Sequence, residues 1–142
     1  MKIKLDEKAF MPIRAHEDDA GLDLRAPYPF AIGGCTPLGG PGKVTIDTGV
    51  HVEIPKGYVG LLTSKSGLNV NENIVGTGTI DSGYTGSIRV KLYNLGPEPY
   101  HFEAGDKIIQ LVVTKIETPD IEVVTEFEET ERGANGFGST GR

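Results

Sequence analysis

The sequence of 142 residues has a single cysteine, no long apolar run and no cluster of basic residues. With Cys35 alone, an intrachain disulfide is excluded. No apolar stretch approaches the length of a bilayer span or of a signal peptide, so we expect a cytoplasmic protein that has no membrane partner. The net charge of −6 and the absence of basic runs favour a small nucleotide over a nucleic acid polymer as the ligand.

Zinc chemistry and covalent catalysis also lack their usual residues. The three histidines, His16, His51 and His101, are scattered and have no cysteine partner, so the spacing predicts no zinc site. Ser66 lies in Lys-Ser-Gly, without the flanking glycines of a nucleophile elbow. Attack by water on a metal-bound phosphate remains, because it needs only a carboxylate base, phosphate ligands and a divalent cation.

Glycine and proline are abundant, with 20 and 9 residues, and the runs between them are short and rich in β-formers. The pattern predicts an all-β sandwich or closed barrel, with Ile88, Val90 and Leu92 facing the core. A short helix is expected only after Ser66, where propensity is poor. The predicted strands are Lys43 to Asp47, His51 to Ile54, Tyr58 to Thr63, Ser87 to Tyr93, Tyr100 to Glu103, Lys107 to Ile116 and Ile121 to Thr125.

Two segments are expected to lie outside the strands. Pro27 to Gly42, rich in glycine and proline, is predicted to be a surface loop, either a tolerated insertion or a partner-binding excursion. Residues 126–142 join an acidic linker to a glycine-rich tail, so we expect a β-barrel domain over residues 1–125 and a flexible arm beyond it. The tail offers backbone N–H groups, hydroxyls and guanidinium groups to a polyphosphate, and Phe137 to a flat base. The arm is therefore predicted to fold over a nucleotide, the alternative being a frayed terminus.

Five segments stand in order along the chain: Asp19-Ala20-Gly21-Leu22-Asp23-Leu24-Arg25-Ala26, Ser64-Lys65-Ser66-Gly67-Leu68, Gly78-Thr79-Ile80-Asp81-Ser82-Gly83-Tyr84-Thr85-Gly86, Gly105-Asp106-Lys107-Ile108-Ile109-Gln110-Leu111 and the glycine-rich tail. In this order they resemble the five motifs of the trimeric dUTPase family. The resemblance implies a jelly-roll-like distorted β-barrel and a homotrimer with shared active sites. It also implies Mg²⁺-dependent hydrolysis of dUTP to dUMP and pyrophosphate.

The same resemblance assigns roles to single residues. Asp81 would orient the attacking water and contact the sugar, Tyr84 would exclude a ribose, and Asp23 would hold a water on Mg²⁺. From the residues alone, Asp81 reads as a turn former, Tyr84 as a core aromatic and Gln110 as an edge-strand amide. The substrate-binding residues that the resemblance implies are Lys65, Ser66, Gly67, Thr79, Ile80, Tyr84, Arg89, Gln110, Arg132, Phe137, Gly138, Ser139 and Thr140.

The chain departs from the family pattern at two places. Lys65 stands where most relatives have arginine, which replaces a planar fork by a point charge. Val75 stands where many have asparagine, although Gly76 and Gly78 would still allow a base to approach closely. Two other functions stay open at this point, a dCTP deaminase of the same fold and a dUTP-responsive regulatory binding protein.

Overall fold

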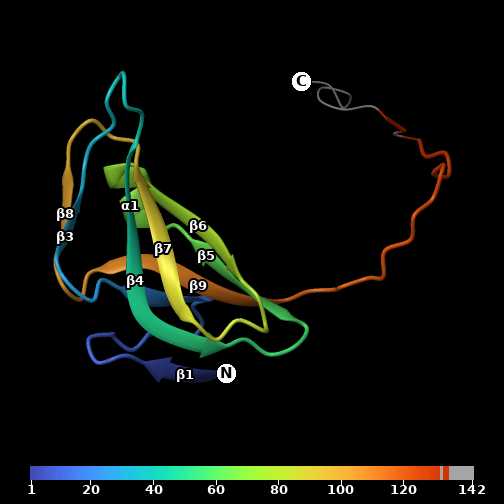
Figure 1. The fold of residues 1–142 in the computed structure, drawn as a ribbon, viewed down its shortest axis with the longest axis horizontal. Coiled ribbons are helices and arrows are strands. Elements are labelled where there is room, and N and C mark those ends of the chain that lie inside the picture. The colour runs from blue at the N-terminus through green and yellow to red at the C-terminus, as the bar shows by residue number, and fades with distance from the viewer. Residues whose placement is uncertain (132, 135–142) are drawn as a thin grey trace.

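The computed structural model describes residues 1–131, 133 and 134. This part of the chain folds into nine β-strands and one short helix (Figure 1). Within it, no helix is both long enough and apolar enough to cross a membrane. The elements in chain order are β1 (Lys2–Leu5), β2 (Gly21–Arg25), β3 (Phe30–Ile32), β4 (Gly42–Glu53), β5 (Tyr58–Thr63), α1 (Ser66–Glu72), β6 (Ile74–Ile80), β7 (Ser87–Asn94), β8 (Tyr100–Phe102) and β9 (Lys107–Lys115).

Seven strands form one antiparallel sheet in the spatial order β1-β4-β7-β6-β5-β9-β2. This sheet curls strongly enough to form a half-barrel, and the β3-β8 pair stands beside β4 and β7 (Figure 1). The predicted all-β fold class is therefore confirmed. The row of paired residues Asp23–Gln110–Thr63–Thr77 crosses four neighbouring strands, from β2 at one edge to β6.

The core is made from aliphatic side chains that alternate along the strands. Ile88 and Val90 are fully buried and Leu92 is nearly so, which confirms the prediction that these three face inward. Burial of each such side chain contributes about 2 kcal/mol relative to leaving it exposed. The small sheet adds an aromatic contact, since the rings of Phe30 and Phe102 stack with centroids 4.7 Å apart.

Four strand predictions agree closely with the structure. β5 has the bounds predicted, and β7, β8 and β9 each differ from the prediction by one residue at the C-terminal end. The helix expected after Ser66 is also present, as α1, and it ends at Asn73 in a left-handed conformation with φ 56°. Asparagine tolerates that conformation better than most residues, so Asn73, a poor helix former, is suited to end the helix.

The segment from Lys43 to Ile54 was predicted as two strands, and this was wrong. The structure has one strand of 12 residues, β4, whose register against β7 shifts between Asp47 and His51. Gly49, at φ 67°, reads as a break in the sequence. In the structure it allows a bulge that bends the strand without ending it.

Three further segments differ from the sequence-based expectation. β1 was missed, because its lysines alternate with apolar residues on a mostly exposed edge strand. β3 lies inside the predicted Pro27 to Gly42 loop, which is therefore only partly a loop, although Leu38 at its tip is fully exposed. Ile121 to Thr125 is not a strand. Its sequence favours extended structure, but a strand needs a partner, and in the described part of the chain this segment pairs with none.

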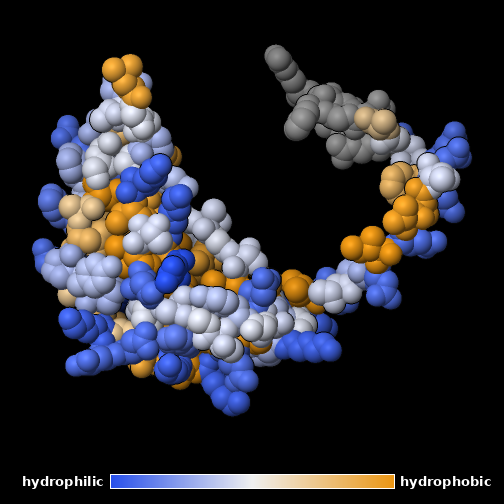
Figure 2. All heavy atoms as spheres, viewed as in Figure 1, coloured by the Kyte–Doolittle hydropathy of each residue, from blue (hydrophilic) through white to orange (hydrophobic). Residues whose placement is uncertain are grey.

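After β9 the chain leaves the curled sheet as an extended arm (Figure 1). Apolar side chains are spaced along this arm and exposed to solvent (Figure 2). Ile121, Val123 and Phe127 are each more than nine-tenths exposed. The arm therefore buries little apolar surface against the described part of the chain.

Candidate active site

A carboxylate is buried at the junction of β2 and β9. Asp23 lies in the middle of β2, opposite Gln110 of β9, and its side chain is 2% exposed. Each of its oxygens meets one ammonium group, with Lys65 Nζ 2.7 Å from Oδ1 and Lys107 Nζ 2.7 Å from Oδ2. The amide of Gln110 adds a longer contact, with Nε2 3.3 Å from Oδ1. These four residues form the Asp23 junction.

Burial alone would raise the pKa of Asp23, but hydrogen bonds from Lys107 and Lys65, and the charges of both lysines, outweigh it. The net effect lowers the pKa of this carboxyl below its ordinary value. Asp23 is therefore ionised at neutral pH, and its Oδ2 can still accept a hydrogen bond from a further donor such as water. The two lysines, 22% and 35% exposed at their side chains, still face solvent in part and can contact an anion.

The structure brings together three residues that the sequence analysis chose, Asp23, Lys65 and Gln110. Gln110 does not lie on an edge strand, because β9 runs between β5 and β2. Lys107 was missed. It is the first residue of β9, immediately before the buried Ile108 and Ile109. A lysine at the start of a buried strand, next to an acidic residue, was the sequence signal that could have identified it.

Lys65 also positions the start of α1, as the N-cap residue of that helix. Ser66 and Gly67 follow as its first residues and are exposed, and a Cβ built at Gly67 would meet no atom within 4 Å. Just upstream, Ser64 Oγ donates to the carbonyl of Gly76 and accepts from its amide, at 3.0 and 2.9 Å. This pair of bonds fixes the β5–α1 corner against β6, with open space over Ser66 and Gly67.

The second cluster of predicted residues lies in the turn from residue 81 to residue 86, which joins β6 to β7. Asp81 is exposed, and its carbonyl accepts from the Tyr84 amide at 3.0 Å. The Tyr84 hydroxyl donates to the carbonyl of Ser87 at 2.8 Å, and its ring crosses over Gly86, where a Cβ would come within 2.6 Å of Cζ. Tyr84 is 42% exposed, so its reading as a core aromatic is wrong.

Beside this turn, β6 and β7 separate. Their pairing is confined to residues 74–76 of β6, while residues 77–80 pair with β5 alone in the chain as described. Thr79 and Ile80 lie on the separated part of β6, and Arg89 lies on the facing stretch of β7, where its Nε is 3.5 Å from Asp47 Oδ2. A Cβ at Gly76 would crowd Ile109 and Leu92, and one at Gly78 would crowd Leu62. Packing against neighbouring strands is therefore enough to explain glycine at both positions, without a ligand.

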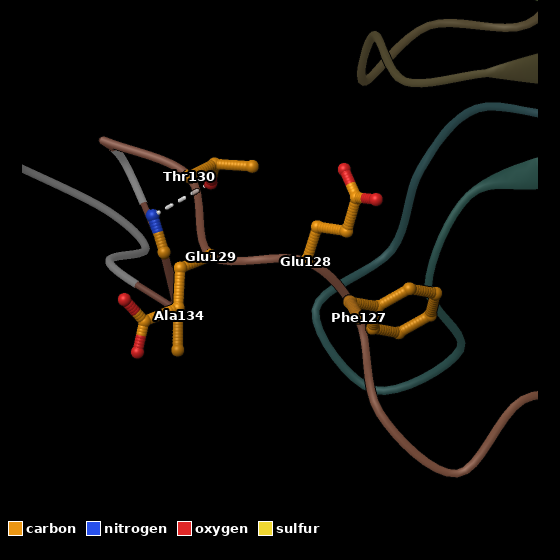
Figure 3. Close-up of a pocket in the computed structure, with 6 residues that line it drawn as sticks. Phe127, Glu128, Glu129, Thr130 and Ala134 are labelled. Atoms are coloured by element: carbon orange, nitrogen blue, oxygen red, sulfur yellow. Dashed lines mark hydrogen bonds between the residues drawn. The ribbon is translucent and has the colours of Figure 1, made fainter.

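The remaining predicted substrate-binding residues belong to the C-terminal tail of the sequence. Arg132, Phe137, Gly138, Ser139 and Thr140 lie outside the described residues. One hollow lies on the arm, lined by residues 127–130, 133 and 134, where the Gly133 amide donates to Thr130 Oγ1 at 3.0 Å (Figure 3). Its charged lining groups, Glu128 and Glu129, repel anions, so this hollow is not the candidate site.

An all-β half-barrel that holds an ionised carboxylate between two partly exposed lysines defines a protein suited to an anionic ligand. A second carboxylate is exposed in the turn between β6 and β7. The dUTPase family model matches residues 7–141, which is nearly the whole chain. The chain therefore belongs to the dUTPase family, as the motifs predicted.

Individual relatives agree. The chain is 41% identical over 145 residues to the deoxyuridine 5'-triphosphate nucleotidohydrolase of Corynebacterium glutamicum, covering 99% of this chain and 93% of that protein. Its fold matches a Staphylococcus bacteriophage 80alpha dUTPase solved with dUPNHPP, at TM-score 0.87 and 34% identity, covering 99% and 98% of the two chains. It also matches a mutant dUTPase from phage phi11 of S. aureus, solved with a structural Mg(II) ion, at TM-score 0.78 and 33% identity, covering 90% and 98%. These neighbours have jelly-roll-type all-β folds, which confirms that part of the fold prediction.

Proposed function

We propose that the protein hydrolyses dUTP to dUMP and pyrophosphate, by attack of water on the α-phosphate. The observation that carries the proposal is the Asp23 junction, an ionised carboxylate held between two lysines in a member of the dUTPase family. Relatives named deoxyuridine 5'-triphosphate nucleotidohydrolase support dUTP as the substrate and favour hydrolysis over deamination of dCTP.

In this proposal Asp81 is the general base. Its exposed carboxylate accepts a proton from the water while the water oxygen bonds to the α-phosphorus. The bond from that phosphorus to the bridging oxygen breaks, and pyrophosphate leaves. The ammonium groups of Lys65 and Lys107 balance charge on the phosphate oxygens, and Ser66 and Gln110 donate hydrogen bonds to them. Tyr84 packs against the deoxyribose.

Magnesium fits the residues of the junction. The described residues contain no group of three or more acidic, histidine or cysteine side chains that would hold a metal unaided. One ionised carboxylate, Asp23, is what a Mg²⁺ ion that keeps several waters and binds substrate phosphates requires. Bound there, the ion would neutralise charge on the triphosphate. Asp23 would accept a hydrogen bond from one of its waters.

Uracil recognition is assigned to the separated edges of β6 and β7. Thr79, Ile80 and Arg89 lie on these edges, and residues 77–80 of β6 carry backbone groups on the edge that turns away from β5. Backbone N–H and C=O groups there suit the acceptor and donor pattern of a pyrimidine. The arm residues Arg132, Phe137, Gly138, Ser139 and Thr140 would close over the base and the outer phosphates.

The site is further proposed to be shared within a homotrimer. Asp81 lies four residues beyond Thr77 along β6, and β6 is three strand spacings from β2, which puts Asp81 and Asp23 on the order of 15–20 Å apart in one chain. One triphosphate does not reach that far with close contacts at both ends. A second copy brings the two clusters together, and its surface would cover the exposed apolar residues of the arm.

The experiment is pyrophosphate release from dUTP, the other deoxynucleotides and UTP, with Mg²⁺ and with EDTA. Release from dUTP alone, abolished by EDTA, is the expected result. Ammonia release from dCTP would favour a deaminase instead.

Truncation after Glu131 tests the arm, and we expect a folded oligomer with severely reduced turnover because phosphate contacts and water exclusion are lost together.

A regulatory role is a second candidate, favoured by the fully exposed Leu38 at the tip of the hairpin between β3 and β4. Similar phage dUTPases control the transfer of virulence genes. Removal of residues 36–40, the tip closed by the Thr36–Gly40 bridge, should leave hydrolysis unchanged if the tip serves a partner. Loss of dUTP hydrolysis in that variant would contradict this role.

A further inference from the structure

The bulge of β4 brings the N-terminal segment against the strand. Gly49 has φ 67°, and a Cβ there would lie 3.0 Å from Ala9 Cβ and 3.2 Å from Asp6 Cβ. The amide of Asp6 donates to the Gly49 carbonyl at 2.9 Å. Asp6 is therefore held at the bulge by its own backbone, with its carboxylate free to contact a side chain of β4.

That side chain is His51, which links two segments far apart in sequence. Its Nδ1 is 2.8 Å from the carbonyl of Thr85, and its Nε2 is 3.3 Å from both carboxylate oxygens of Asp6. A carbonyl only accepts, so Nδ1 carries the proton and donates to Thr85. The side chain of His51 is 17% exposed, and the carboxylate of Asp6 lies against its second ring nitrogen, Nε2.

Neighbouring residues of β4 bind the same stretch of chain. The buried Thr48 Oγ1 donates to the carbonyl of Ile88 at 2.8 Å, and Ser87 Oγ donates to the carboxylate of Asp47. Both of these bonds fix β7 after the turn has ended. Among the side chains of β4 in the described structure, His51 is the one whose hydrogen bond reaches Thr85, inside the 81–86 turn.

We propose that His51 is a positioning residue for the turn that carries Asp81 and Tyr84, acting through its bond to the Thr85 carbonyl and oriented by Asp6. The proposal rests on the proposed roles of Asp81 and Tyr84. Thr85 follows Tyr84 directly, so a shift of its carbonyl displaces the ring that would pack on the sugar. A displacement of about 1 Å at such a site is enough to lower turnover strongly.

Two substitutions separate the two bonds of His51. The amide nitrogen of asparagine stands near the place of Nδ1, and that of glutamine near the place of Nε2. His51→Asn therefore keeps the donor to Thr85, while His51→Gln keeps only the donor to Asp6. We expect His51→Gln to lower kcat for dUTP about tenfold and to narrow the preference for dUTP over UTP, the scale of one lost hydrogen bond. His51→Asn, which loses only the contact with Asp6, should lower kcat by no more than about threefold.

His101→Gln is the matched control, because His101 is exposed on β8, and it should change neither quantity. Thermal unfolding is recorded for every variant. A lower melting temperature in His51→Gln with kcat and substrate preference unchanged would show a purely structural role and overturn the proposal. Equal behaviour of the asparagine and glutamine variants would overturn it too.

If His51→Gln fails to fold, Asp6→Asn tests the same arrangement at an exposed residue. It loosens the ring without removing the Thr85 bond, so we expect a loss of about threefold in kcat and the same direction of change in preference. Wild-type kinetics in Asp6→Asn would then contradict the proposal. A wild-type protein that does not hydrolyse dUTP would instead overturn the proposed function, and this inference with it.

Discussion

The two carboxylates of the candidate site are held in opposite ways. Asp23 is buried in the middle of a strand and meets three side-chain donors, from Lys65, Lys107 and Gln110. Asp81 is exposed at the end of a strand, and the turn that carries it is held by backbone and by Tyr84. A buried charge costs several kcal/mol in desolvation unless it is paired, whereas an exposed one costs little.

Because of this difference in burial, we expect the two carboxylates to contribute to different properties of the protein. In the proposed function Asp23 contributes to folding and to binding together, because its pairing with the lysines exists before any ligand arrives. In the proposed mechanism Asp81 keeps its hydration until a substrate displaces the water, so we expect its contribution to fall on turnover. Substitutions at the two positions should therefore separate stability from activity.

The largest effect is expected at Asp81. Asp81→Asn keeps the shape of the side chain and removes the basic carboxylate, so turnover of dUTP should fall by roughly 10²-fold or more. Binding of a nonhydrolysable dUTP analogue, measured by calorimetry, and the melting temperature should both stay near wild type. A variant that hydrolyses dUTP at the wild-type rate would transfer the role of base to another group, with Asp23 the next candidate.

Asp23→Asn, unlike Asp81→Asn, should lower stability as well as turnover. The substitution leaves two lysines without their charged partner, and we expect a loss of about 2 kcal/mol in the free energy of unfolding, with reduced turnover as well. Urea denaturation measures the loss. Glu53→Gln is the control, since the Lys2–Glu53 pair is well exposed at both side chains, and its stability should be nearly unchanged.

The stabilisation by Asp23 should depend on pH in one direction. Its pKa in the folded protein is lowered from an ordinary value of 3.8, so the folded state binds the proton less tightly than the unfolded state. The contribution is then fully present at pH values above 3.8 and is lost as the pH falls through the lower, folded value. The stability difference between wild type and Asp23→Asn, followed by denaturation from pH 7 downward, should shrink only in that acidic range.

Tyr84 offers a finer test of the exposed turn, because its ring and its hydroxyl are separable. Tyr84→Ala removes both and should narrow the preference for dUTP over UTP by about tenfold, the scale of one well-packed contact. Tyr84→Phe loses only the bond to the Ser87 carbonyl and should keep most of the preference. Equal discrimination in the alanine variant and the wild type, measured as the ratio of kcat/KM values, would remove Tyr84 as the sugar filter.

The same contrast explains what could be predicted from the sequence. β7 could be predicted because its alternation of apolar and polar residues is a local pattern, and β5 because it is a short run of β-formers between turns. The motifs selected Asp23, Lys65 and Gln110 from the sequence alone. Lys107 was missed because its role depends on Asp23 lying across the strand pair, which is not local information. The β4 bulge and the link from His51 to Asp6 were missed for the same reason.

The smallest effect is expected at Lys65, where most relatives have arginine. In this chain the ammonium already pairs with Asp23 at 2.7 Å, a contact that a point charge makes as well as a planar fork does. Lys65→Arg should keep that pair and gain a second donor toward a phosphate. Turnover should therefore change by no more than about threefold, and the melting temperature should stay near wild type. Lys65→Met, which keeps the length and removes the charge, should raise KM for dUTP well beyond that range. If the arginine variant lost as much as the methionine variant, the junction would depend on the geometry of the ammonium rather than on its charge.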